Sequence, residues 1–497
     1  MSEAIAPARG GFPVRHQGWS VIATLALVIL ADVLIFSALP GLGWFAFILV
    51  TATAIYALGS AAVRKRSAAG AFAMLAALPL VESPSLLAAL LALAGLGVAA
   101  LSANDQLPKL LDAIPSVLLR FATLLPFRLF GDALLASSHV SQQGLGSSIL
   151  RHALGWLVPL LFLAIFTTLF VAANPLIDGA FTQLSLDWIA LPQPIRVFFW
   201  MAVAAAIWGL LRPKLLPVRN SKAEAVIMAR SESALFGAAA ITRSLVLFNV
   251  LFAVQTVLDL FYLWGGASLP DGLSYADYAH RGAFPLIATA LFAAVFVLAA
   301  MRPHGHGINN TLIRRLVYIW VGQNVLLCIS SILRLDLYVE VYSLTELRLA
   351  AGIWMVLVAI GLVLIVLRIW LQRSNNWLIA TNLLSLASVL YACAWVDFSA
   401  LIAGFNVEHS RELKGDGVAL DLGYLRELGP TALPALDRYI SAVPEAEEAI
   451  ALRRLMAEEF WAGRSEDWRD WSWREQRLSH YLDSGSGNGD NRILSPS

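Results

Sequence analysis

Charged and polar side chains inside apolar segments are the residues of this sequence that could do chemistry. Asp32 and Asp259 each lie about six or seven residues from the end of an apolar run, a depth of about 10 Å in a helix. Gln255, Asp259 and Tyr262 are spaced to share one face of a helix. A second polar stripe, in a later run, ends at Arg334. An ionised group in hydrocarbon costs at least about 2.5 kcal/mol on insertion scales, so these side chains need a partner or a task.

Two polar segments, 266–282 and 335–348, follow these stripes, and we expect both to be loops on the outer side of a membrane. If they fold over the stripes, they form one outward-facing cavity rich in tyrosine and charge that could bind a ligand or a partner. The candidate ligand-binding residues are Asp259, Tyr262, Asp271, Tyr275, Asp277, Tyr278, Arg281, Arg334, Asp336, Tyr338, Glu340, Tyr342 and Arg348. Alternatively, Asp259, Arg334, Asp336 and Arg348 only neutralise one another, because buried ion pairs are often architectural.

Other chemistry finds little support in the sequence. His304 and His306 are two ligands in one short segment, too few for a typical zinc site, and we expect no metal and no cofactor. Cys328 and Cys393 fall in apolar runs and predict buried small side chains. The common zinc-protease, serine-hydrolase and nucleotide-binding motifs are absent, and so is a chain of intramembrane acids or histidines that could carry protons. The sequence therefore favours a non-enzymatic protein over an enzyme.

The elements that position these residues are predicted to be membrane spans. Hydrophobic residues make up 59% of the chain and charged residues 14%, too few to cover a soluble surface. A net charge of +1 gives no reason to expect nucleic-acid binding. Runs of about 20 apolar residues predict an all-α polytopic protein with eleven transmembrane helices. They lie near 19–39, 42–62, 68–82, 84–101, 150–173, 195–211, 244–265, 283–301, 314–334, 349–370 and 376–396. The alternative for the third and fourth is one re-entrant hairpin.

The basic residues predict the orientation of these spans. With residues 1–18 as a cytoplasmic segment, the inner segments hold 20 Lys and Arg and the outer ones 4. The bundle, 19–404, is then embedded in the lipid bilayer of a bacterial inner membrane. An odd number of spans places the C-terminus outside.

Composition changes near Gly404. Residues 405–497 carry 17 acidic and 11 basic side chains, which predicts a polar helical module over 405–483 and a disordered tail over 484–497. Within it, Glu466–Leu482 has helical spacing with Ser465 as a plausible N-cap. Its tryptophans at 468, 471 and 473 could dock on a membrane, stack on a sugar or pack within the module.

A further amphipathic helix is predicted over 108–135.

Several segments resemble a family of uncharacterised bacterial multi-pass inner-membrane proteins known only as a domain of unknown function. The resemblance rests on 269–284, 331–338, 342–348, 174–176 and 406–408, and covers most of 150–410. Ser343 stands where the family usually has Gly, and His280 where a second Arg is common. The resemblance implies no activity, but its signature residues coincide with the predicted loops and stripes.

We therefore expect a non-enzymatic envelope protein whose outer cavity and acidic tail bind a ligand or a partner protein. The alternatives are a transporter or lipid-handling protein that uses Asp259 and Arg334 to hold a charged head group, and a membrane-embedded transferase or hydrolase that uses loop carboxylates. The sequence does not indicate an oligomeric state.

Overall fold

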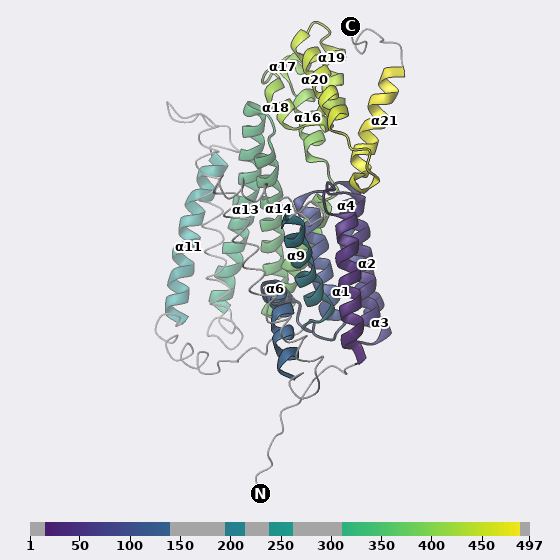
Figure 1. The fold of residues 1–497 in the computed structure, drawn as a ribbon. Helices are drawn as coiled ribbons and strands as arrows, with labels where there is room; N and C mark the ends of the chain where they lie inside the picture. The colour runs from purple at the N-terminus through teal and green to yellow at the C-terminus, as the bar shows by residue number, and fades with distance from the viewer. Residues whose placement is uncertain (1–14, 140–193, 214–237, 262–310, 488–497) are drawn as a thin grey trace, which may run out of the picture. The chain divides into compact units, whose positions relative to one another are not determined.

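The computed structural model describes residues 15–139, 194–213, 238–261 and 311–487, whose regular structure is helical apart from an isolated bridge between Ser410 and Val418. The predicted spans at 150–173 and 283–301 lie outside these residues. Two compact units make up the chain (Figure 1). Unit 1 comprises 1–109, 113–216 and 465–476, and unit 2 comprises 110–112, 217–464 and 477–497.

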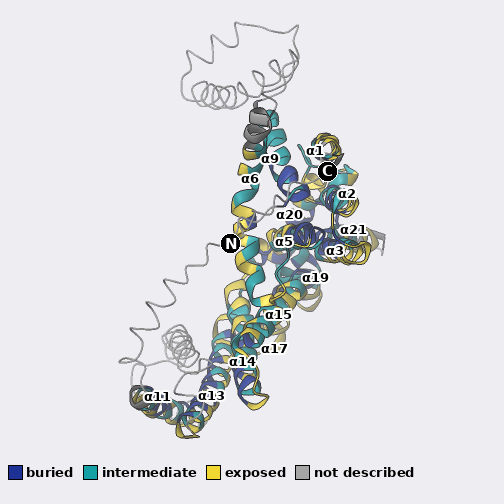
Figure 2. Ribbon diagram, turned by 90° about the horizontal axis from the view of Figure 1, so that it is seen from below, coloured by how far each residue is buried: buried dark blue, intermediate teal, exposed yellow. Residues whose placement is uncertain are grey.

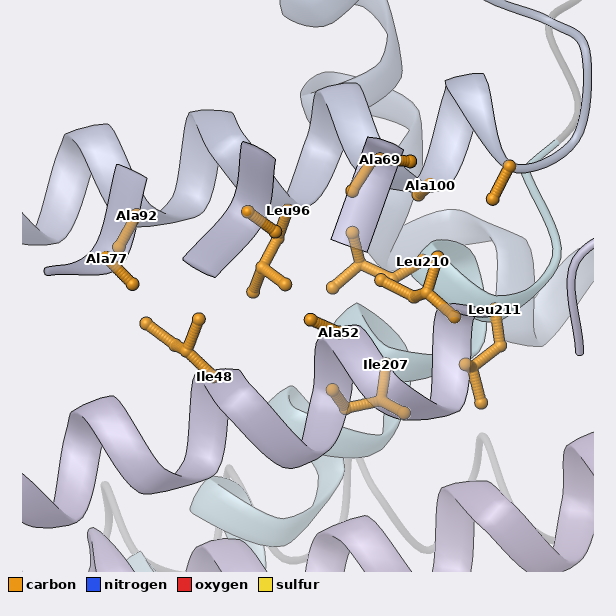
Figure 3. Close-up of a cluster of buried hydrophobic side chains, with 14 of the residues drawn as sticks. Ile48, Ala52, Ala69, Ala77, Ala92, Leu96, Ala100, Ile207, Leu210 and Leu211 are labelled. Atoms are coloured by element: carbon orange, nitrogen blue, oxygen red, sulfur yellow. The ribbon is translucent and has the colours of Figure 1, made fainter. Parts of the chain in front are cut away.

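Unit 1 is a bundle of apolar helices around a core of small side chains. Its helices are α1 (Arg15–Leu34), α2 (Leu42–Leu58), α3 (Val63–Ala77), α4 (Pro79–Glu82), α5 (Leu86–Ser102), α6 (Ile114–His139), which follows the 3-10 turn η1 (Leu111–Ala113), α9 (Pro194–Leu211) and the 3-10 turn η5 (Trp468–Asp470). Figure 3 shows side chains of α2, α3, α5 and α9 meeting in this core. A Cβ on Gly95 would lie 2.5 Å from Ala76 Cβ, so small residues let α3 and α5 approach closely.

The α3–α5 region folds as a helical hairpin. Pro79 begins α4 because proline fits the first turn of a helix, where no N–H partner is needed. Ser85 caps α5 by accepting a hydrogen bond from Ala88 N over 3.1 Å. The structure thus contains helices in both of the apolar runs predicted at 68–82 and 84–101. The amphipathic segment predicted at 108–135 is also helical, as η1 and α6.

Both ends of α9 are held by an arginine, a tryptophan and a carboxylate. Near its start, Arg196 Nε donates to Asp32 Oδ1 of α1 over 2.7 Å, and Trp200 Nε1 donates to the same oxygen over 2.8 Å. Near its end, Trp208 Nε1 donates to Asp132 Oδ2 of α6 over 3.2 Å, and Arg212, just past the helix, lies 3.6 Å from that oxygen. In each set the guanidinium also lies over the indole ring. These contacts fix α9 along its axis.

Unit 2 contains α13 (Thr311–Tyr342), the longest helix in the described residues, and three further long apolar helices. These three are α11 (Ala238–Asp259), α14 (Glu346–Trp370) and α15 (Asn375–Cys393). Buried side chains of all four, among them Phe252, Trp320, Leu362 and Leu378, form one core. Ser374 caps α15 by accepting from Trp377 N over 3.2 Å.

Four described helices are long and apolar enough to cross a membrane: Ile241–Asp259, Thr311–Tyr342, Glu346–Trp370 and Asn375–Cys393. Shorter apolar helices include Gly18–Leu34, Leu42–Leu58, Leu86–Ser102 and Ile195–Leu211. Figure 2 shows exposed residues along these helices. They include large apolar side chains such as Ile29, Leu247 and Leu384, as expected of surfaces that face lipid. The helices indicate a membrane protein, and eleven spans stay a prediction.

The C-terminal helices pack on the end of α13. They are α16 (Phe398–Glu408), α17 (Arg411–Lys414), α18 (Leu422–Glu427), α19 (Leu433–Ala442), preceded by the 3-10 turn η4 (Pro430–Ala432), α20 (Glu447–Gly463) and α21 (Trp473–Gly487). Val339 and Leu344 share a core with Ile402, Leu436 and Leu482. Gly404, where the composition changes, lies inside α16.

The structure differs from the sequence prediction at two points in this region. A single helix was expected over Glu466–Leu482, but α21 begins at Trp473, because Trp471 O accepts a hydrogen bond from Leu42 N and holds the preceding segment away from helical geometry. Disorder was expected from Ser484, but α21 continues to Gly487. Leu482 is buried, and helix propagation from a packed turn costs little.

Candidate functional site

The two polar stripes predicted from the sequence meet between α11 and α13. Arg334 forms an ion pair with Asp259, and the two side chains are 3% and 1% exposed. Gln255 Nε2 donates to Asp259 Oδ1 over 2.9 Å, which orients the carboxylate from its own helix. Both charges are withdrawn from solvent and directed at each other. The geometry therefore favours a role in joining the helices, because a ligand would have to break this pair to bind there.

Residues 335–342 form the last turns of α13, whereas a loop was predicted from 335 to 348. The loop was predicted because hydropathy falls at Asp336 and Glu340. That prediction was wrong: no Pro or Gly interrupts the sequence between Asn324 and Tyr342, and the helix continues. Val339 is buried and keeps this end of α13 packed. Asp336 and Glu340 are exposed, one helical turn apart.

The end of α13 is closed by a short turn that Arg348 braces. Ser343 adopts a left-handed backbone conformation with φ of 65°. Arg348 Nη1 donates to Tyr342 O over 2.6 Å and also to Ser343 O. The guanidinium lies 4.6 Å from the ring centroid of Tyr338, whose ring packs on that of Tyr342. Arg348 thus satisfies carbonyls at the helix end, where a cation also complements the helix dipole.

Asn406 of α16 ties the same turn to the C-terminal helices. Its Oδ1 accepts from Leu344 N over 2.7 Å, and its Nδ2 donates to Leu344 O over 2.9 Å. Asn406 is buried, and this paired contact joins positions 62 residues apart. Tyr424 Oη accepts from Glu346 N over 3.0 Å. The turn is therefore held from both sides and cannot shift without breaking buried hydrogen bonds.

A cavity of about 320 Å³ opens beside this turn, between the end of α13 and residues 405–418. Its polar lining comprises Glu340, Ser343, Asn406, His409, Lys414 and Asp416. The His409 ring stacks on Phe405 with 4.1 Å between centroids, and its Nδ1 lies 2.9 Å from Phe405 O. The cavity therefore offers two cationic or donor groups and two carboxylates.

The wall of this cavity at 409–418 is built from a compact loop. Gly415 and Gly417 both have left-handed φ values, 84° and 96°, which favour glycine. Arg411 N donates to Val418 O over 2.9 Å and closes the loop. Within the described residues, no cluster of three or more His, Cys, Asp or Glu could hold a metal ion. The arrangement can recognise charge and hydrogen-bonding groups.

The structure separates the sequence-predicted residues into three groups. Asp259 and Arg334 pair between helices, Tyr338, Tyr342 and Arg348 form the braced turn, and Glu340 alone lines the cavity. Asp336 is exposed on α13 and does not line it. Tyr262, Asp271, Tyr275, Asp277, Tyr278 and Arg281 lie outside the described residues.

Sequence reasoning missed His409, Lys414 and Asp416. Each is an ordinary polar residue of the acidic tail, and only the fold of the 409–418 loop brings them to Glu340. A usable signal was the Gly-Asp-Gly run at 415–417, which is typical of a tight turn between helices.

The family model described as "Domain of unknown function (DUF4153)" matches residues 20–439. The chain belongs to the DUF4153 family. No curated protein and no solved structure matches the chain at a significant level. The part matched by the DUF4153 model contains the Asp259–Arg334 pair, the braced turn and the whole cavity lining, whereas residues 465–476 follow it.

Proposed function

We propose that this DUF4153 protein is a non-enzymatic membrane protein of the bacterial cell envelope that binds a small polar ligand in the cavity between α13 and residues 405–418. The observation that carries the proposal is the mixed-charge lining on a rigid frame. Asn406 and Arg348 hold the turn by buried or charged hydrogen bonds, so the backbone beside the cavity is held in place. Pre-organisation of this kind lowers the cost of binding.

The lining defines the class of ligand. Lys414 and His409 can donate to an anionic group, and Glu340 and Asp416 can accept from an ammonium or hydroxyl group. The volume of about 320 Å³ is at the lower end of the range of small-molecule sites, about 300 to 1,000 Å³. A small molecule that carries both charges, such as an amino acid, fits this lining better than a long apolar chain.

We propose further that the cavity faces the extracytoplasmic side. The 20 to 4 distribution of basic residues supports this orientation. So does a contact inside unit 1, because residues 465–476 pack on the α1–α2 turn, which the same distribution assigns to the outer side. The bilayer is then one partner, and the C-terminal helices could also receive an envelope protein.

A thermal-shift screen of the purified protein tests the binding proposal. We expect amino acids or similar zwitterions to raise the melting temperature, and uncharged sugars to have a smaller effect. Lys414→Ala and Glu340→Gln should each abolish the shift without lowering the melting temperature of the free protein, because both side chains are exposed. Asp336→Asn is the matched control, because it removes a carboxylate one turn away on the same helix.

Two outcomes would contradict the proposal. If Asp336→Asn and Glu340→Gln weakened the shift equally, general charge and not the cavity would explain binding. If no small polar compound shifted the melting temperature and the cavity variants behaved as wild type in the host, the cavity would have no ligand-binding function.

A further inference from the structure

A short segment near the C-terminus, Ser465–Gln476, belongs to unit 1 and packs on the ends of its apolar helices. Leu42 N donates to Trp471 O over 3.0 Å, and Arg469 Nη1 donates to Val33 O over 2.6 Å. A Cβ on Gly41 would lie 2.5 Å from the carbonyl carbon of Asp470, so the segment touches the α1–α2 turn directly. This position requires glycine at 41.

The segment also contacts the α4–α5 end of the unit. Arg474 Nε lies 3.5 Å from Oε1 of Glu82, and Glu82 is buried. The segment, which we call the strap, therefore lies across two turns at one end of the bundle, α1–α2 and α4–α5. Figure 1 shows the start of α21 beside α4.

The strap exposes large aromatic side chains at this end. Trp468 is 57% exposed and Trp473 is 51% exposed. The turns that the strap contacts expose Leu39 and Leu86, and α1 exposes Val33 and Ile29. The exposed tryptophans therefore lie at the end of the bundle, near turns that also expose apolar side chains.

We propose that the strap is a membrane-interface anchor, with Trp468 and Trp473 in the head-group region of the bilayer. Tryptophan favours this region because its ring is apolar and its indole N–H is polar. The exposed apolar side chains of the neighbouring turns and of α1 favour lipid as the occupant. The anchor would hold the chain after α20 at the bilayer surface next to unit 1.

The strap is attracted to the bilayer by its aromatic side chains and not by electrostatic interaction with charged lipid. The strap has four acidic and two basic side chains. Arg469 is bonded to Asp467 and Val33, and Arg474 faces Glu82, so both cations are engaged within the protein. Anchoring should therefore be the same in zwitterionic and anionic lipid.

Site-specific fluorescence in nanodiscs tests this proposal. Cys328 and Cys393 are first replaced by Ala, and Trp468→Cys, Trp473→Cys and the control Glu466→Cys are each labelled with an environment-sensitive probe. Glu466 is an exposed acidic residue of the same strap. We use only full-length protein that elutes as a single folded species, so that a folding failure cannot be read as a loss of anchoring.

We expect a lipid-borne quencher in the head-group region to reduce emission at 468 and 473, and aqueous iodide to reduce emission at 466. The loss of probe emission at 468 and 473 should be equal in zwitterionic and anionic nanodiscs. Iodide quenching at all three positions would overturn the proposal, because the strap would then be in water. Shielding of 468 and 473 from both quenchers would also overturn it, because protein, for example a second copy of the chain, would then cover the tryptophans.

Discussion

Charged side chains withdrawn from solvent in this protein find partners on neighbouring helices. Asp259–Arg334 is such a buried pair and Asp132–Arg212 is mostly buried, whereas the arginine of Asp32–Arg196 is 42% exposed. Removing one member of a buried pair is more costly than removing both, because the remaining charge stays desolvated. The depth of Asp259 and Arg334 in their apolar runs was visible in the sequence. The other two pairs depend on the register of α9 against α1 and α6, which periodicity alone does not reveal.

Arg334→Ala should lower the free energy of unfolding by about 3 to 5 kcal/mol, because it leaves Asp259 buried and uncompensated. Adding Asp259→Asn should recover part of this loss. Thermal unfolding in detergent measures both effects. The control is Asp105→Asn, which breaks the exposed Lys65–Asp105 pair and should cost less than about 1 kcal/mol. Additive losses at 259 and 334 would contradict the pairing.

Ser343→Gly should stabilise the protein by about 1 kcal/mol, because a residue with a Cβ is strained at a φ of 65°. Ser385→Gly, in the interior of α15, should instead destabilise it by about 0.5 kcal/mol. The two melting temperatures should move in opposite directions. If both fell, the left-handed conformation of Ser343 would not be the source of strain.

At the scale of elements, the apolar helices were predictable and their ends were not. Apolar runs gave α2, α5, α9 and α14 within a few residues, because burial in lipid or in a core follows hydropathy. The last turns of α13 carry charged residues and tyrosine, so they resemble a loop. They are helical because Val339 and the turn held by Asn406 make contacts distant in sequence, and because Arg348 braces the end of the helix. The cavity depends on those same contacts, which explains why only Glu340 of its polar lining was predicted.

The packing of α21 on α19 makes part of the stability pH-dependent. Tyr481 donates to Asp437 Oδ2 over 3.0 Å, and Arg453 Nε donates to Asp437 Oδ1 over 2.9 Å. Burial, together with the charge of Asp437 and this hydrogen bond, raises the pKa of Tyr481 from 10.0 to about 12. The folded state then binds this proton more tightly than the unfolded state, so its contribution to stability is complete below pH 10 and is lost as the pH rises toward about 12.

Tyr481→Phe should therefore flatten the fall in melting temperature across this alkaline range. Tyr391→Phe, in α15, is the control for the loss of one hydroxyl group. Melting curves at a series of alkaline pH values measure the difference. An unchanged slope for Tyr481→Phe would mean that other groups control alkaline unfolding.

At the scale of the whole molecule, an orientation with the C-terminus outside has a direct test. Alkaline phosphatase fused after Ser497 should be active, and a cytoplasmic-only fluorescent protein at the same point should be dark, because long domains are translocated largely regardless of charge. A fusion after Arg66, in the α2–α3 region, should give the reverse. Bright fluorescence at the C-terminus would show that the number of spans is even.

The two arginine–tryptophan sets on α9 have a consequence for the choice of bilayer. Arg196 and Arg212 are 16 residues apart, which corresponds to about 24 Å along a helix, whereas a typical hydrocarbon layer is about 30 Å thick. Because α1 and α6 hold these ends, α9 cannot slide to lengthen its apolar stretch. If α9 spans the bilayer as predicted, the surrounding lipid thins to match it, so we expect unit 1 to be most stable in short-chain lipids. Melting temperatures in a series of nanodiscs with increasing acyl length should fall, and replacing Asp32 by Asn should weaken that dependence.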